Sequence, residues 1–349
     1  MTPTLTVLVP AYNEAGAIGR TIDSLTAQEV APERILVVDD GSSDGTGDIA
    51  RAHGAEVITP PANLGSKAKA QNYGLEHVDT DLVLPVDADT VLAPDYVALI
   101  KEPFADESVT IAAGCVLTQK QETVWERGRQ MEYLSGFHWF RPVQHWYNAP
   151  LVCSGCCSAF RVDDLRDFGG FPERTLVEDI DYTWSQQITG KRAAYVADAV
   201  AYAAEPETAH FMRVQLRRWK HGYFQNVRQH YLPMIRRKPM LALWVSLSLL
   251  EILLSPLLLV LLAVALVTGL DPAQMGAWWA VSEALVFGPA LAYAVVKRKL
   301  RPWAVLKCWP AFYVLKVFNF WYDLRGIAKE LIAVPLGWTR SSLIYEKGH

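Results

Sequence analysis

Short runs of apolar and β-branched residues recur in the first part of the chain, and more polar stretches with helical spacing separate them. The expected strands are Leu5–Val9, Arg34–Val38, Glu56–Thr59 and Leu82–Val86, and the helices between them are Gly16–Ala27, Gly45–Ala52 and Lys67–Glu76. Strands that alternate with helices of this length form βαβ units, because parallel neighbours need a long crossover connection. The pattern therefore predicts an α/β fold with a mainly parallel sheet and helices on both faces.

The pattern changes in the last third of the chain. From Met240 to about Val267, and again from about Met275 to Val296, apolar residues dominate over lengths that suffice to cross a bilayer. Basic residues stand at 236–238 and at 297–301, whereas the loop between the two runs contains Asp271 and neither Lys nor Arg. By the positive-inside rule, this asymmetry predicts two spans with the preceding domain in the cytosol.

The segment 302–336 is apolar but is broken by prolines and charges. It is compatible with a third span, a re-entrant pair or helices in the membrane interface, and a cytosolic C-terminus favours an even number of crossings. We therefore expect two spans plus a re-entrant or interfacial segment. The predicted division is a globular domain at 1–210, amphipathic interfacial helices at 211–239, membrane helices at 240–336 and a cytosolic tail at 337–349.

Composition narrows the class of protein. The 349 residues are 51% hydrophobic, with a mean hydropathy of +0.10, which is high for a purely soluble protein. The formal net charge of −4 argues against a nucleic-acid-binding protein. The C-x-x-C-C run at 153–157 lacks a second ligand pair at zinc spacing, so buried thiols are the favoured interpretation. Because the first strand begins at Leu5, we expect no signal peptide and a domain that stays in the cytosol.

Polar residues directly follow three of the expected strands. Pro10–Glu14 follows the first strand, Asp39–Thr46 the second, and Asp87-Ala88-Asp89 the fourth. Asp, Ser and Gly also favour turns and helix caps, which would be a sufficient explanation of the second loop alone. In a parallel sheet, however, ligands bind beyond the carboxyl ends of the strands. Two carboxylates one residue apart can hold one divalent ion shared with phosphate oxygens, so the three loops together predict a phosphate and metal site.

Together with motifs further along, these loops resemble the inverting glycosyltransferases of family 2, the group that contains cellulose, chitin and hyaluronan synthases. The motifs are V-P-A-Y-N-E at 9–14, V-D-D-G-S-S-D-G-T at 38–46, V-D-A-D at 86–89, the acidic pair at 178–179 and Q-x-x-R-W at 215–219. The segment 63–68 is similar to the family's N-x-G-K-A motif, but Ser66 stands between the glycine and the lysine. The resemblance covers nearly all of 5–225 and implies the GT-A fold, a Rossmann-like α/β domain.

The resemblance also implies a nucleotide-sugar donor, expected to be UDP-linked, bound together with Mg²⁺ or Mn²⁺. Asp89 is the expected metal ligand. Lys67 is explained equally well as a solvated surface lysine. The residues expected to contact the nucleotide-sugar are Pro10, Tyr12, Glu14, Asp39, Asp40, Lys67, Asp87, Gln215, Arg218 and Trp219.

The acidic pair Glu178-Asp179 is the expected catalytic centre, with Asp179 as general base. A base at this place takes a proton from the acceptor hydroxyl during a single displacement, so an α-linked donor yields a β-linked product. Gly155, Cys156 and Trp219 are the residues that the resemblance places at the acceptor. Gln215, Arg218 and Trp219 share one helix face, which also suits an amphipathic interfacial helix.

Three functions remain open at this point. The leading expectation is a multi-pass enzyme of the inner cell membrane that transfers a sugar to a lipid or glycan acceptor at the cytosolic face. A processive β-polysaccharide synthase is the second, and with so few spans it would need oligomers or a partner subunit to export its polymer. The third is a catalytically silent nucleotide-binding scaffold, which the presence of both Asp89 and Asp179 disfavours.

Overall fold

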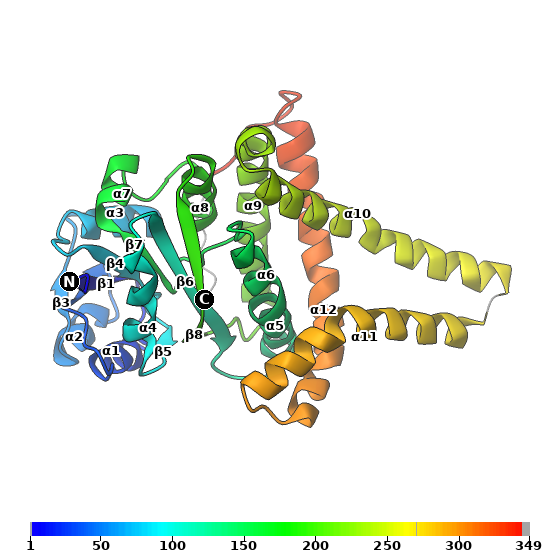
Figure 1. Cartoon of the computed structure of the whole chain (residues 1–349), viewed down its shortest axis with the longest axis horizontal. Helices are drawn as coiled ribbons and strands as arrows, with labels where there is room; N and C mark the ends of the chain where they lie inside the picture. Colours follow the sequence, from blue (N-terminus) through cyan, green and yellow to red (C-terminus); the bar gives the residue numbers. More distant parts are fainter. Residues whose placement is uncertain (1, 270, 344–349) are drawn as a thin grey trace.

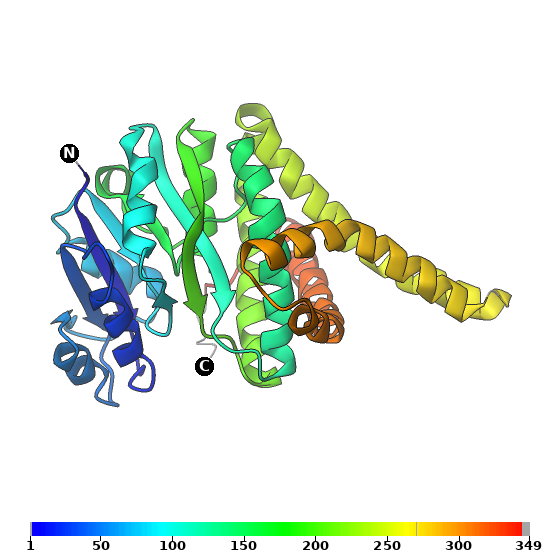
Figure 2. The same ribbon diagram turned by 60° about the horizontal axis from the view of Figure 1, so that its bottom comes forward.

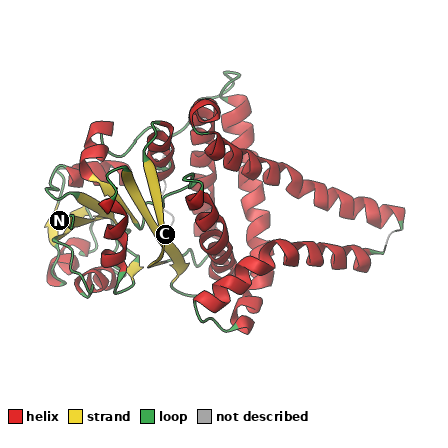
Figure 3. Ribbon diagram, viewed as in Figure 1, coloured by secondary structure: helices red, strands yellow, loops and turns green. Residues whose placement is uncertain are grey.

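The centre of the molecule is one mixed β-sheet (Figures 1 and 3). The computed structural model describes residues 2–269 and 271–343, apart from a set of side chains within 254–286. In this part of the chain, eight strands pair in the order β3-β2-β1-β4-β7-β6-β8-β5. They are β1 (Leu5–Ala11), β2 (Arg34–Asp39), β3 (Glu56–Ile58), β4 (Leu82–Pro85), β5 (Val91–Leu92), β6 (Val109–Thr118), β7 (Ser158–Arg161) and β8 (Arg192–Ala203).

The first four strands agree with the sequence prediction. β1 pairs in parallel with β2 on one side and with β4 on the other, and β3 extends the sheet beyond β2. In the other half of the sheet β6 and β8 also pair in parallel, but β7 runs antiparallel to both β4 and β6, and β5 runs antiparallel to β8. β5 and β7 are only two and four residues long, too short to give a periodic signal in the sequence.

Helices cover both faces of the sheet. Along β1, Val7 and Val9 face one hydrophobic cluster and Leu8 faces the other, as alternation in a strand requires. The helices on the first face are α1 (Ile18–Thr26), α2 (Thr46–Ala52), α4 (Tyr96–Lys101) and α5 (Val124–Ser135). Those on the second are α3 (Lys67–Leu75), α7 (Val162–Phe168) and α8 (Glu178–Ile188). The predicted helices after β1, β2 and β3 are therefore all confirmed.

A helical layer flanks the β8 side of the sheet and includes α5. Its other members are α9 (Ala209–Arg237), α10 (Pro239–Thr268), α11 (Pro272–Lys297), α12 (Pro302–Gly326) and the π-helical η3 (Ile327–Ala333), with η2 (Gly136–Phe140) and α6 (Arg141–Trp146) following α5. α9 packs against α8, α10 and α12. The segment predicted as interfacial helices thus forms one 29-residue helix whose inner face is buried. In Figures 1 and 2, α10 and α11 leave this layer together and extend away from the sheet.

The predicted membrane spans are not confirmed. Among the described residues, none of the helices combines the length and the apolar character that crossing a bilayer requires. Part of each predicted span, at 240–267 and 275–296, consists of residues whose side chains lie outside the described set. The predicted tail at 337–349 is described as far as residue 343, and its last six residues lie outside the described range.

Candidate active site

A cavity lies where the strand order reverses. β1 connects to β2 on one side and borders β4 on the other, and ligands of such sheets bind in the crevice beyond the strand ends at this point. The cavity has a volume of about 420 Å³. Its lining comes from the loops after β1, β2, β4 and β8, the start of α3, the 154–156 loop, the start of α8 and one face of α9.

Hydrogen bonds between the loops after β1 and β2 fix the first wall. Asn13 adopts a positive φ of 53°, and its side-chain oxygen accepts from the Ser43 N–H while its own N–H donates to Ser42 Oγ. Asp44 Oδ2 accepts from the Ala15 N–H. These bonds hold the backbone of the first loop rigid, so Pro10, Tyr12 and Glu14 are presented to the cavity as predicted.

Asp39 and Asp40 have different environments. Asp40 lines the cavity, is 6% exposed and accepts a 2.7 Å hydrogen bond from the Leu64 N–H. Burial raises its pKa above the ordinary value, although backbone N–H donors act in the opposite direction. Asp39 does not line the cavity; it accepts from the Ser42 N–H and packs against Gly47 at the start of α2. Asp39 therefore stabilises the turn, whereas Asp40 is the one of the two that lines the cavity.

The two aspartates after β4 both line the cavity. The side-chain amide of Gln119 donates to the backbone oxygens of Asp89 and Tyr202, which ties this loop to the end of β8. Two carboxylates are fewer ligands than a divalent ion uses, and no cluster of three or more His, Cys, Asp or Glu suited to a metal occurs among the described residues. Asp87 and Asp89 therefore fit an ion whose remaining ligands are phosphate oxygens and water.

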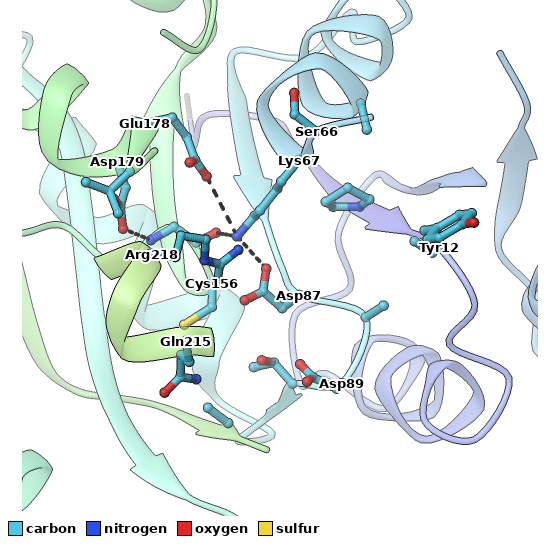
Figure 4. A pocket seen from close by; sticks show the side chains of 18 of the residues that line it. Tyr12, Ser66, Lys67, Asp87, Asp89, Cys156, Glu178, Asp179, Gln215 and Arg218 are labelled. Carbon is cyan, nitrogen blue, oxygen red and sulfur yellow. Dashed lines mark hydrogen bonds and ion pairs between the residues drawn. The ribbon is translucent and has the colours of Figure 1, made fainter. Parts of the chain in front are cut away.

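Lys67 lies between the two acidic parts of the site (Figure 4). Its Nζ is 2.5 Å from Asp87 Oδ1 and 3.9 Å from Glu178 Oε1, and it donates to the Gly155 carbonyl oxygen at 3.3 Å. Its side chain is 17% exposed, so the alternative of a solvated surface lysine is wrong. Ser66, the extra residue in the motif, is the N-cap of α3 and accepts from the Lys69 N–H. The insertion thus starts the helix that places Lys67 over the cavity.

The acidic pair stands at the N-terminus of α8, as predicted from its position. Asp179 Oδ2 accepts a 2.9 Å hydrogen bond from the Gly155 N–H, which orients the carboxylate toward the cavity wall at 154–156. Glu178 is 9% exposed. Burial and the neighbouring Asp179 raise the pKa of Glu178, while the charges of Lys67 and Arg218 oppose the shift.

The 154–156 loop joins the two charged groups through its backbone. The N–H of Gly155 donates to Asp179 and its carbonyl oxygen accepts from Lys67. Cys156 also lines the cavity, whereas Cys153 and Cys157 are fully buried. A hydrogen bond with Cys157 and burial raise the pKa of the Cys156 thiol well above its ordinary value, so this cysteine is a neutral wall residue.

The Q-x-x-R-W motif lies on α9, and all of its defined residues, Gln215, Arg218 and Trp219, line the cavity. Figure 4 shows Arg218 close to Cys156 and the acidic pair, with Gln215 further toward Asp89. The structure thus brings together every predicted site residue except Asp39.

Sequence reasoning missed Tyr133 and Glu205, which line the same end of the cavity as Trp219. The Tyr133 hydroxyl donates to Glu205 Oε1 at 2.6 Å. The signal for Glu205 was present, because it follows the end of β8 by two residues, as Asp87 follows the end of β4. Tyr133 lies on α5 within the aromatic-rich stretch 125–147, and that composition suits packing in a membrane interface as well as contact with an acceptor.

Three comparisons with known proteins agree with this geometry. The family model described as glycosyl transferase family 2 matches residues 6–169. Two proteins called N-acetylglucosaminyltransferase are similar: one from Rhizobium sp. is 31% identical over 75% of this chain and 61% of its own length, and one from Sinorhizobium fredii is 32% identical over 77% of this chain and 67% of its own length. The chain thus spans about three fifths to two thirds of these relatives.

A solved structure shares the architecture. The mannosyltransferase PcManGT from Pyrobaculum calidifontis, in complex with GDP-Man and Mn²⁺, superposes with a TM-score of 0.61 at 25% identity, covering 85% of this chain and 87% of its own. Because 85% of this chain is covered, the similarity extends beyond the residues that the family model matches.

Proposed function

The chain belongs to glycosyl transferase family 2, and from this premise we propose that it is an inverting enzyme that transfers a hexosyl or N-acetylhexosaminyl group from a nucleotide-sugar to a hydroxyl of a lipid or glycan acceptor. The relatives named as N-acetylglucosaminyltransferases support UDP-N-acetylglucosamine as the first donor to try.

One observation carries the proposal. A single cavity has the strand-end carboxylates Asp40, Asp87 and Asp89 in one wall and the acidic pair with Trp219 in another. Lys67 bridges the two groups. A nucleotide bound at the strand ends would direct its diphosphate and sugar toward Asp179, and an acceptor ring stacked on Trp219 would present its hydroxyl from the other side.

The reaction is a single displacement. Asp179 takes the proton of the acceptor hydroxyl as that oxygen forms a bond to the anomeric carbon. The bond from the anomeric carbon to the diphosphate oxygen breaks, and its electron pair leaves with the nucleoside diphosphate. Arg218 and Lys67 supply positive charge beside the leaving group. Because attack and departure occur on opposite faces, an α-linked donor gives a β-linked product.

A divalent ion suits the donor end of the cavity. Asp89, with Asp87 beside it, would hold Mg²⁺ or Mn²⁺ together with the diphosphate, and a bound ion would supply charge stabilisation to the departing group. The Mn²⁺ complex of the mannosyltransferase supports this assignment. Lys67 now pairs with Asp87, so we expect this ammonium group to exchange its carboxylate partner for phosphate when the donor binds.

The test is nucleoside diphosphate release by the purified protein with a panel of nucleotide-sugars, Mn²⁺ or Mg²⁺, and acceptors that include chito-oligosaccharides and a membrane lipid extract. We expect release with one UDP-sugar, dependent on the divalent ion and on an acceptor, and a β-anomeric product by proton NMR. No release with any donor and acceptor would favour the silent nucleotide-binding scaffold, and an α-linked product would contradict the single displacement.

A processive synthase is the second candidate, and the Q-x-x-R-W face of α9 in the cavity wall favours it. A stacking residue beside the base can hold the end of a growing chain as well as a single sugar. Sizing the product distinguishes the two: a polymer supports the synthase, and one added sugar supports single transfer. Export of a polymer would require additional helices from a second copy or a partner subunit.

We further propose that the enzyme is attached to the inner cell membrane, with the sheet domain on the cytosolic side. An exposed apolar stripe on α12 supports attachment, with Trp303 67% and Trp321 58% exposed. The other members of the stripe are Leu306, Val314, Val317 and Leu324. Successive members stand three, four or eight residues apart, which places them on one helix face.

The charges around this stripe suit anionic lipid. Asp323 and Glu330 are the only acidic residues in 299–343, and both are buried. Arg301, Lys307 and Arg325 are exposed. A surface with an apolar stripe, aromatic ends and unopposed cations is typical of a helix that lies in a membrane interface.

Binding to vesicles tests the attachment. We expect Trp303→Ser/Trp321→Ser to bind phosphatidylglycerol vesicles at least about tenfold more weakly than wild type, because two apolar contacts are lost. Val30→Ser, an exposed apolar residue of the sheet domain, is the matched control and should bind normally. For topology, a membrane-impermeant thiol reagent should label Asp271→Cys from the periplasmic side if α10 and α11 cross, whereas labelling from the cytosolic side would contradict a multi-pass arrangement.

A further inference from the structure

A buried arginine that does not itself line the cavity contacts several residues that do, at the α9 end of the site. Arg129, on α5, has a side chain that is 4% exposed. Its Nη2 donates to Gln215 Oε1 at 2.8 Å, and its Cζ lies 4.8 Å from the centre of the Trp219 ring. One guanidinium group therefore contacts two residues of the Q-x-x-R-W motif at once.

The remaining nitrogens of Arg129 fix its own orientation. Nη1 donates to Glu132 Oε2 at 2.6 Å, and Nε donates to Glu205 Oε2 at 3.2 Å. The other oxygen of Glu205 accepts from the Tyr133 hydroxyl. Both carboxylate oxygens of Glu205, which lies just after β8, therefore accept a hydrogen bond from α5. Because the guanidinium group is planar and two carboxylates hold it, the direction of its remaining N–H donor and the orientation of its face are fixed.

Neighbouring contacts extend the arrangement to α12. Asn319 donates to Glu132, and Lys220, next to Trp219 in the chain, pairs with Asp323 at 2.9 Å. Trp125, one turn before Arg129, packs edge-on against Phe318 with ring centres 4.8 Å apart. Arg129 thus lies where α5, α9, α12 and the end of β8 meet. The contacts in this region hold α9, which carries the Q-x-x-R-W motif, in position relative to the other three elements.

From this geometry we propose that Arg129, anchored by Glu205 and Glu132, is a positioning residue for the acceptor: it holds the Trp219 ring and the Gln215 amide in the orientation in which they line the cavity. The proposal rests on the function proposed above in placing the acceptor on Trp219. Arg129 itself does not line the cavity, so it would act through these two residues.

The chain offers a sharp pair of variants. Arg129→Lys keeps the positive charge but replaces the planar fork with a point charge that cannot serve three partners and stack on a ring. Arg161→Lys is the matched control: Arg161 stacks on Phe104 and donates to two backbone carbonyls, but it pairs with the start of β4, at the end of the sheet away from the cavity.

A direct readout does not depend on turnover. In protein labelled with 5-fluorotryptophan, the Trp219 resonance is identified by its loss in Trp219→Phe. We expect Arg129→Lys to shift or broaden that ¹⁹F resonance, and Arg161→Lys to leave it unchanged. An unchanged Trp219 resonance in folded Arg129→Lys would overturn the proposal, whatever the activity of the protein.

Kinetics supply the second readout, with UDP-N-acetylglucosamine as donor and N,N′-diacetylchitobiose as acceptor. We expect Arg129→Lys to raise the KM of the acceptor about tenfold, to change kcat less than about threefold and to leave the KM of the donor unchanged. An equal loss for donor and acceptor, or wild-type values throughout, would contradict the assignment.

A third variant distinguishes a change in the orientation of Trp219 from general misfolding. Glu205→Gln keeps the arginine and the shape of its anchor but removes one charge, so we expect a smaller shift of the Trp219 resonance and of the acceptor KM in the same direction. If wild type shows no transfer with any donor, the proposed function fails while the ¹⁹F comparison still decides the role of Arg129.

Discussion

The two ends of the cavity are built in different ways. At the end proposed to bind the donor, loops that follow neighbouring strands are joined by hydrogen bonds between side chains and backbone, such as Asn13 with Ser43 and Asp44 with Ala15. At the end proposed to bind the acceptor, charged side chains meet from segments far apart in the chain, such as Arg129 with Glu205 and Lys220 with Asp323. Local turns thus determine the shape of the first end, whereas helix packing determines the shape of the second.

This difference explains what could be predicted from the sequence. Asp40, Asp87 and Asp89 follow regular strands, so hydrophobic periodicity alone placed them at one edge of a sheet. Asp179 and the α9 motif were found through resemblance, since no periodicity relates them to the strands. Arg129 and Tyr133 lie on α5, but their partners come from α9 and from the segment after β8, and only the folded chain shows that they meet.

The strands β5 to β8 escaped prediction for a related reason. β6 is buried on both faces over its whole length and shows no alternation, and β7 and β5 are very short. Asp39 was assigned to the nucleotide because it adjoins Asp40, but successive residues at a strand end point to opposite faces. One of the two could therefore reach the cavity, and the other holds the turn.

The largest expected effect comes from the residue between the two ends. Asp179→Asn preserves the shape of the side chain and removes the base, so acceptor-dependent nucleoside diphosphate release should fall about 10³-fold. The measurement is steady-state release at saturating donor. Glu178→Gln is the comparison variant and should lose much less; an equal loss in both would mean that the acidic pair acts as one unit and that Asp179 alone is not the base.

The donor end is tested by Asp89→Asn. Loss of this carboxylate should lower kcat/KM by at least about 100-fold and abolish the dependence of nucleotide binding on Mn²⁺, because the ion loses its protein ligand. Titration calorimetry with UDP, with and without Mn²⁺, measures this. Asp79→Asn, an exposed aspartate paired with Arg34 on the surface, is the control. Unchanged Mn²⁺ dependence in Asp89→Asn would exclude Asp89 as the metal ligand.

The acceptor end should respond to a change in helix packing that leaves the donor end alone. A Cβ on Gly128 would lie 2.8 Å from the Ala311 carbonyl oxygen and 3.0 Å from Leu315 Cβ, where α5 and α12 approach closely. Gly128→Ala should therefore destabilise the protein by about 1–3 kcal/mol and weaken binding of the acceptor more than binding of the donor. Chemical unfolding and the two KM values check this.

Gly16→Ala is the control for that substitution, because a Cβ there has no neighbour within 4 Å. It should be neutral or slightly stabilising. If Gly128→Ala raised the KM of donor and acceptor alike, helix packing would support both ends of the cavity, and the two ends would not be structurally separate.

The smallest expected effect concerns stability and pH. The pKa of Glu178 is raised in the folded protein, mainly by burial, so the folded state binds more protons than the unfolded state as the pH rises from the ordinary value of 4.5. The free energy of unfolding of wild type, relative to Glu178→Gln, should therefore be highest below that pH and should decrease as the pH rises through the raised pKa. Urea unfolding of both proteins at several pH values measures the difference; an increase with pH would contradict burial as the dominant cause.

We assign Asp179 to the chemical step and the strand-end carboxylates to donor binding. The most direct test is titration of the reactive UDP-sugar into Asp179→Asn in the presence of Mn²⁺. We predict a Kd within about twofold of the wild-type value while transfer is lost, since Asp179 makes its hydrogen bond to the Gly155 N–H and not to the donor loops. Loss of donor binding together with transfer would contradict the account and would place Asp179 in the nucleotide-sugar site.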